Sequence, residues 1–133
     1  MLFEWVLMVS QEELDTLFSQ LRALLKKYEG ILKPKKDEIG FYDLWSFKDL
    51  EIAGRKRKEV FFASVVTRKN YVGFYYMPIY TDTGLSEVFK PELLSLLKGK
   101  SCFHIKLLTP DLENQVKEAL EFGYKLYQDR GWV

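Results

Sequence analysis

Hydrophobic residues near the start of the chain recur three or four positions apart. Leucine and aromatic residues follow this spacing from Leu14 to Tyr28, which predicts an amphipathic helix over residues 11–29 with one buried stripe. Ser10 and Glu13 match a capping box, in which each side chain accepts a hydrogen bond from a free backbone donor. Gly30 is a natural end for this helix.

A second amphipathic pattern closes the chain. Thr109 is a suitable N-cap and Pro110 a suitable first helical residue, while Gly131 ends the pattern. The apolar stripe between them consists of Leu112, Val116, Ala119, Leu120, Gly123, Leu126 and Tyr127. A shorter helix is predicted to begin at Pro91 and to end at Gly99.

The middle of the chain shows strand patterns instead. Strands are predicted over residues 41–47, 60–67, 71–79 and 101–108. In 60–67 both alternating faces are apolar, which indicates a central strand with something covering each side. A turn at residues 68–70 joins it to the next strand, so these two form the predicted centre of the sheet.

Single residues refine these strands. Gly73 indicates a close approach or a bulge, and Pro78 indicates a sheet edge or a strand end. The strand at 101–108 alternates Phe103, Ile105 and Leu107 on one face with Cys102, His104 and Lys106 on the other.

The remaining segments are predicted to connect these elements. Residues 33–40 form a polar loop, 54–58 a solvated basic turn and 82–84 a further turn, while 1–9 are a short helix or an arm. Consecutive strands flanked by helices predict a single α+β domain over residues 1–133. We expect an antiparallel sheet of about five strands, with the N- and C-terminal helices packed on one face.

Composition narrows the function classes. Among 133 residues, 47% are hydrophobic and 29% charged, as in ordinary globular domains. The net charge of +1 gives no overall attraction to nucleic acid or anionic membrane, so neither partner is expected. A single cysteine and no pattern typical of a signal peptide or membrane span indicate a cytoplasmic protein.

Candidate chemistry is sparse. Cys102 and His104 share a strand face, so a thiolate–imidazole pair is one hypothesis, although no third orienting group is visible. One thiol and one imidazole do not make a closed zinc site. Four carboxylates cluster in sequence, but neighbouring lysines oppose a metal site there: Glu38, Asp43, Asp49 and Glu51. The basic run at 55–58 fits a device against sheet association better than a nucleic-acid site.

Aromatic residues are the distinctive feature, at 16% of the chain. If helices cover one sheet face, the other face is aromatic with polar tips, which suits a small-molecule site, a protein partner or a homodimer interface. The residues expected to line it are Tyr42, Trp45, Phe62, Tyr71, Tyr75, Tyr76, Met77, His104 and Lys106. The sequence therefore favours a non-enzymatic binding domain with no resident metal and a ligand of unknown identity.

Two segments also resemble a known family. Residues 71–75 (YVGFY) and 97–106 (LKGKSCFHIK), followed by the closing helix, are similar to the YdhG-like domain family of small bacterial proteins. The resemblance covers about residues 40–133. It implies a frataxin-like sheet with helices on one side, and one branch of the family is described as an iron chaperone. Metal handling is therefore one alternative function, and a Cys/His-dependent enzyme is another.

Overall fold

The structure is a computed structural model that describes residues 9–81 and 89–133. The predicted turn at 82–84 and nearly all of the predicted N-terminal arm lie outside these residues. No helix in the described part of the chain is long and apolar enough to cross a membrane.

Seven strands form one antiparallel sheet, in the order β1-β3-β6-β7-β9-β8, with β2 also paired to β3. The strands are β1 (Leu32–Lys33), β2 (Asp37–Glu38), β3 (Phe41–Ser46), β6 (Val60–Arg68), β7 (Tyr71–Tyr76), β8 (Leu97–Lys98) and β9 (Cys102–Ile105). The β6–β7 hairpin occupies the centre, as predicted. Two further strands, β4 (Leu50–Ile52) and β5 (Arg55–Arg57), form a separate ribbon.

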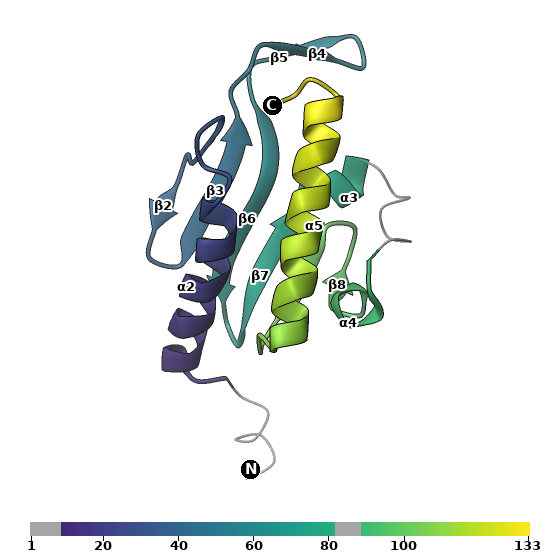
Figure 1. The fold of residues 1–133 in the computed structure, drawn as a ribbon. Coiled ribbons are helices and arrows are strands. Elements are labelled where there is room, and N and C mark those ends of the chain that lie inside the picture. The colour runs from purple at the N-terminus through teal and green to yellow at the C-terminus, as the bar shows by residue number, and fades with distance from the viewer. Residues whose placement is uncertain (1–8, 82–88) are drawn as a thin grey trace.

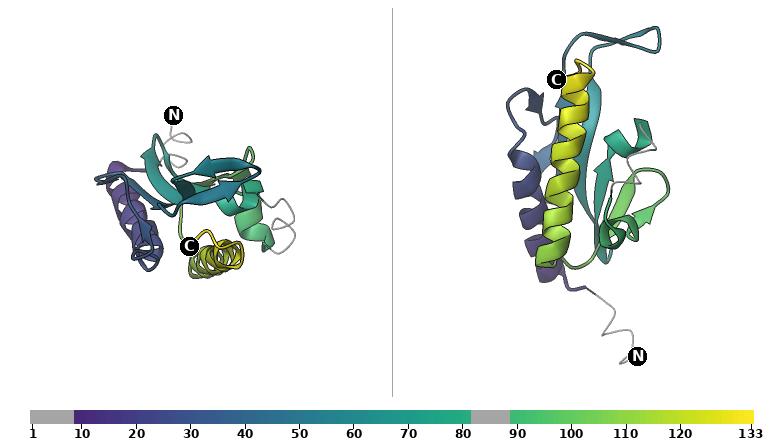
Figure 2. Two further views of the ribbon diagram at one scale, coloured as in Figure 1. Left: turned by 90° about the horizontal axis from the view of Figure 1, so that it is seen from above. Right: turned by 45° about the vertical axis from the view of Figure 1, so that its right-hand side comes forward.

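Two long helices pack side by side on the same face of the sheet (Figures 1 and 2). They are α2 (Gln11–Lys26) and α5 (Pro110–Asp129), and two short helices, α3 (Met77–Thr81) and α4 (Pro91–Leu94), lie near α5. The predicted α+β class, with terminal helices on one sheet face, is confirmed.

Both long helices begin as the sequence predicts. Ser10 Oγ accepts from the Glu13 backbone N–H at 3.1 Å, and Glu13 Oε1 accepts from the Ser10 backbone N–H at 3.3 Å. This completes the capping box. Thr109 Oγ1 accepts from the Leu112 backbone N–H at 3.1 Å, and Pro110 opens the first turn of α5.

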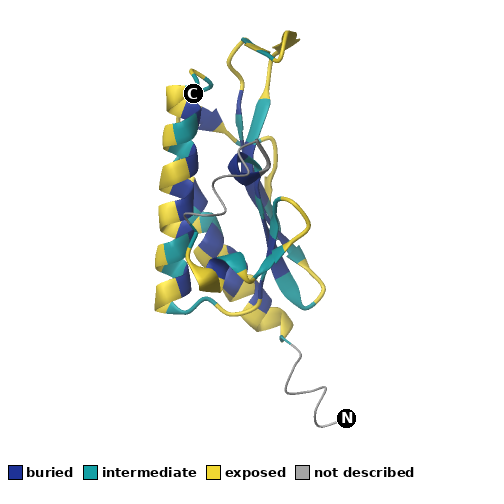
Figure 3. Ribbon diagram, turned by 90° about the vertical axis from the view of Figure 1, so that its right-hand side faces the viewer, coloured by how far each residue is buried: buried dark blue, intermediate teal, exposed yellow. Residues whose placement is uncertain are grey.

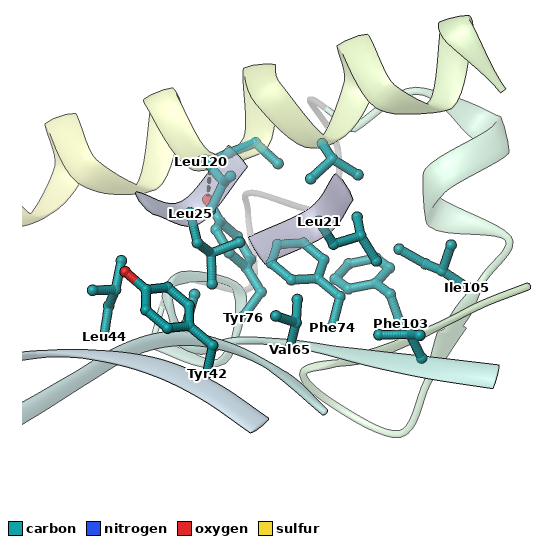
Figure 4. Packing of buried hydrophobic residues seen from close by; sticks show 14 of the residues in the cluster. Leu21, Leu25, Tyr42, Leu44, Val65, Phe74, Tyr76, Phe103, Ile105 and Leu120 are labelled. Carbon is teal, nitrogen blue, oxygen red and sulfur yellow. Dashed lines mark hydrogen bonds between the residues drawn. The ribbon is translucent and has the colours of Figure 1, made fainter. Parts of the chain in front are cut away.

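The core lies between the sheet and these two helices, whose buried sides face the strands (Figure 3). Figure 4 shows Leu21, Leu25 and Leu120 above Val65 and Phe74 of the central strands.

Two tyrosine hydroxyls tie α5 to the strands beneath it. Tyr76 donates to the Ala119 carbonyl oxygen. Tyr127 donates to the Phe61 carbonyl oxygen at 2.7 Å.

Two predicted strands are shorter than expected. The strand predicted to reach residue 79 ends at Tyr76, because α3 begins at Met77. Pro78 lies in the first turn of this helix, where a missing backbone donor costs nothing. The strand predicted over 101–108 ends at Ile105, so Leu107 is 71% exposed instead of sharing the core face.

Three predictions for short segments were only partly right. The predicted loop at 33–40 includes the last residue of β1 and all of β2, each paired with β3, and residues 54–58 are mostly strand β5. The chain reverses instead at Ala53 and Gly54, whose φ angles of 53° and 78° suit a two-residue hairpin turn. The short helix begins at Pro91 as predicted but ends at Leu94, before β8.

Candidate functional site

The strand register sorts the central side chains into two rows on opposite faces of the sheet. Residues that pair across antiparallel strands share a face. One row of partners is Tyr42, Val65, Phe74 and Phe103, which lies in the core under the helices. The next row is Asp43, Ser64, Tyr75 and Cys102, which faces away from the helices. We call this second side the open face.

Three residues predicted to line the ligand site belong to the core instead. Tyr42, Phe62 and Tyr76 are fully buried on the helix-covered face. Tyr42 and Tyr76 occupy alternate positions from the open-face residues of β3 and β7. A register shift at Leu44/Trp45 places Phe61 on the open face and turns Phe62 inward.

Other predicted residues do lie on the open face. Trp45, Tyr75 and Met77 line a shallow trough of about 360 Å³. The remaining lining residues, which the sequence interpretation did not select, are Phe41, Asp43, Phe61, Ser64, Val66 and Arg68. Residues Tyr71 and His104 stack on each other farther along the same face, with ring centroids 4.0 Å apart and planes 17° apart. Lys106 is exposed just beyond β9 and does not line the trough.

Aromatic rings form the sides of the trough, and β6 forms its floor. Trp45 and Phe61 pack against each other with centroids 5.1 Å apart and planes inclined by 56°. Ser64 and Val66 are buried between strands β3 and β7. The Trp45 indole Nε1 is enclosed and has no hydrogen-bond partner among the described residues.

Cations lie over these rings. Lys36 Nζ is 4.9 Å from the centroid of the Phe41 ring. Arg68 donates to the Tyr75 hydroxyl from Nε at 3.2 Å and from Nη2 at 2.9 Å. Neither cation has a carboxylate partner within the described part of the chain.

The acidic groups nearby are already engaged. Asp43 Oδ1 accepts from the backbone N–H groups of Lys35 at 2.8 Å and Lys36 at 3.0 Å. Glu59 forms an ion pair with Lys35 at 2.5 Å, and Lys35 Nζ also lies 3.8 Å above the Trp45 ring. Because Asp43 keeps its carboxylate charge and Lys35 is paired with Glu59, Lys36 and Arg68 together leave a small net positive charge around the trough.

Cys102 and His104 do not have the electrostatics of a nucleophilic pair. Burial raises the pKa of the Cys102 thiol above its usual value, although Tyr75 and Arg68 oppose this shift. Burial, with Lys98 and Lys106, lowers the pKa of His104. An activated thiolate–imidazolium pair requires a lowered thiol pKa and a raised imidazole pKa, which is the reverse of both shifts.

Metal ligands are not gathered either. Within residues 9–81 and 89–133, no group of three or more His, Cys, Asp or Glu side chains is placed to hold a metal ion. Asp43 is committed to backbone amides, and Glu51 pairs across the ribbon with Lys56.

A larger hollow of about 610 Å³ lies between α4 and α5, next to Leu93 and Phe122. Its wall includes Phe89 and Lys90, which directly follow residues outside the described part of the chain. No site is assigned to this hollow, because charged residues of its lining already form ion pairs within the described chain: Lys90 with Glu118, Lys117 with Glu113, and Glu121 with Lys27.

Comparisons with known proteins give no match from which a function could be inferred. No family model matches the sequence, and neither a curated protein nor a solved structure matches the chain. The similarity to the YdhG-like domains therefore stays a prediction.

Proposed function

We propose that this domain binds a flat, negatively charged small molecule in the trough of the open face. The observation that carries the proposal is the pairing of partly exposed aromatic rings with cations that have no carboxylate partner. Rings from β3, β6 and β7 offer stacking surfaces, and their edges and faces favour another aromatic ring. The volume of about 360 Å³ is near the small end of the range for ligand pockets.

The cations at the trough favour a flat ligand that carries a negative charge. Lys36 lies over Phe41 of β3, and Arg68, the last residue of β6, reaches Tyr75 of β7, so a cation contacts a ring on each side of the trough. A carboxylate or phosphate group on the ligand would accept charge-assisted hydrogen bonds from these side chains.

The family resemblance is compatible with a binding role but adds no ligand. We also infer YdhG-like kinship as a proposal, because the resemblance implies a sheet with helices on one side and the fold has that arrangement. An iron-handling role receives less support, because the described residues do not gather metal ligands. An enzyme based on Cys102 is opposed by its raised pKa together with the missing third group.

A matched set of three probes tests the proposal. These are 2-naphthoate, which is flat and anionic, 2-naphthamide, which is flat and neutral, and cyclohexanecarboxylate, which is anionic but not flat. Thermal unfolding should show stabilisation by 2-naphthoate above that by either of the others. A ligand present at 100 times its dissociation constant stabilises by about 2.7 kcal/mol. No stabilisation by any probe at millimolar concentration would overturn the proposal.

Substitutions then locate the binding. Arg68→Gln should weaken binding of 2-naphthoate about 10- to 100-fold, since charge-assisted hydrogen bonds contribute about 1.5–3 kcal/mol, while binding of 2-naphthamide should be unchanged. Arg55→Gln removes the same charge from an exposed residue on the separate ribbon and is the control.

Light scattering of the wild type and of Phe61→Arg tests self-association through the open face. A wild-type dimer that this variant dissociates would assign the open face to a second copy and refute the small-molecule site.

A further inference from the structure

The β4–β5 ribbon stands apart from the rest of the fold. It projects beyond the end of the main sheet (Figure 1) and forms no substantial packing with any other described helix or strand. An isolated two-stranded ribbon is only marginally stable in water. Adjacent like charges at 55–58 reduce its stability further. Core packing therefore does not account for this element.

Its register sorts the charges by face. Leu50 pairs with Arg57, and Ile52 pairs with Arg55. These four side chains share one face, on which both charged groups are guanidinium groups. Glu51 pairs with Lys56 on the opposite face, where acidic and basic charges balance.

The arginine face is available to a partner. Arg55 and Arg57 are exposed and form no ion pair or hydrogen bond within the described chain. Because they are two residues apart on one strand, their Cα atoms are separated by about 6.6 Å. Two guanidinium groups presented side by side suit a row of phosphates, which they bind through paired hydrogen bonds.

The local charge differs sharply from that of the whole chain. Residues 48–58 carry five Lys and Arg against two Asp and Glu, a net charge of +3, whereas the whole chain has +1. The whole-chain value is the ground on which the sequence disfavours nucleic acid. A projecting element exposes its own charge to a partner, and the distant acids of the domain are screened within about 10 Å.

We propose that the ribbon docks into the major groove of duplex DNA, with Arg55 and Arg57 directed at phosphates and base edges. The major groove accommodates a two-stranded β-ribbon. A membrane surface fits less well, because Leu50 and Ile52 are half-buried and Phe47 is the one exposed large apolar side chain described in residues 47–58. This inference is independent of the small-molecule trough.

Fluorescence anisotropy with a labelled 20-base-pair duplex of mixed sequence tests the docking at 50 mM salt. The double variant Arg55→Gln/Arg57→Gln should bind at least tenfold more weakly. Its slope of log affinity against log salt should be smaller by about 0.9 for each arginine that contacts a phosphate, and so by up to about 1.8. The control Lys56→Gln/Lys58→Gln removes the same charge, leaves both arginines and should lose less affinity.

Any one of four outcomes would overturn the proposal. Micromolar protein that does not bind the duplex removes it outright. An equal loss in both double variants assigns the effect to diffuse charge. Equal affinity for a single-stranded 20-mer excludes groove docking. Tighter binding to vesicles containing 30% phosphatidylserine than to the duplex assigns the ribbon to membranes. All four residues are exposed, and circular dichroism verifies that each variant folds.

Discussion

Replacing Gly123 by alanine should destabilise the fold, although the same change stabilises most helices. Alanine in place of glycine favours a helix interior by about 1 kcal/mol. Gly123, however, lies where α5 crosses the sheet and α3. A Cβ atom there would lie 2.7 Å from Pro78 Cγ and 2.9 Å from Tyr76 Cζ, and closer still to the Tyr76 hydroxyl.

The magnitude follows from how little those neighbours can move. Tyr76 is fully buried, and its hydroxyl is held by the Ala119 carbonyl one turn earlier in α5. Overpacking a core position costs about 1–3 kcal/mol. Displacing the hydroxyl also weakens a buried hydrogen bond that contributes about 1 kcal/mol. After the helix preference is subtracted, we expect Gly123→Ala to lower the free energy of unfolding by about 1–3 kcal/mol.

Urea unfolding followed by circular dichroism measures this change in two backgrounds. In Tyr76→Phe protein the nearest atom to the new Cβ is gone, so Gly123→Ala should cost less there than in the wild type. Pro78 remains, so the relief should be partial. A rise in stability, or the same loss in both backgrounds, would refute the reasoning from close packing.

Three further predictions concern single polar groups. Asp43→Ala should lower the free energy of unfolding, measured by urea titration, by about 1–3 kcal/mol, because the backbone donors of Lys35 and Lys36 lose their acceptor. Asp43→Asn keeps a carbonyl oxygen and should cost less. Equal losses in the two variants would contradict this prediction. The single histidine, His104, should titrate by NMR below 6.5, because burial lowers its pKa. Protonation then favours the unfolded chain, so stability should fall as the pH drops below about 6.5, and His104→Gln should flatten that fall. Cys102 should react with iodoacetamide at pH 8 more slowly in the native than in the urea-unfolded protein, because burial raises its pKa; equal rates would contradict the shift.

Local signals in the sequence predict the helix starts well. Ser10 and Glu13 need only each other and the backbone between them, so their capping box is readable without the rest of the fold. Thr109 and Pro110 work in the same way. The ends of elements depend on tertiary context, so the sequence pattern places Pro78 at the end of a strand, whereas it lies in α3.

The site was predicted only in outline. Strict alternation along β3 separates Tyr42 from Trp45, but it does not say which of them faces the helices. The register shift at Leu44/Trp45 is a property of strand pairing and has no local signature. The sequence pattern places Arg68 in a turn, whereas it is the exposed final residue of β6. Its position on the open face becomes clear only from its pairing with Tyr71.

The last turn of α5 and the residues that follow it support the trough without lining it. Tyr127 holds the backbone oxygen of Phe61, and Ser46 Oγ donates to the Trp132 carbonyl at 2.5 Å. Both strands that carry the Trp45–Phe61 wall are thus anchored from behind, through the thickness of the sheet. Substitutions at these anchoring residues on the helix-covered side should therefore change the position of Trp45 and Phe61. They would alter the width of the trough without changing the residues that line it.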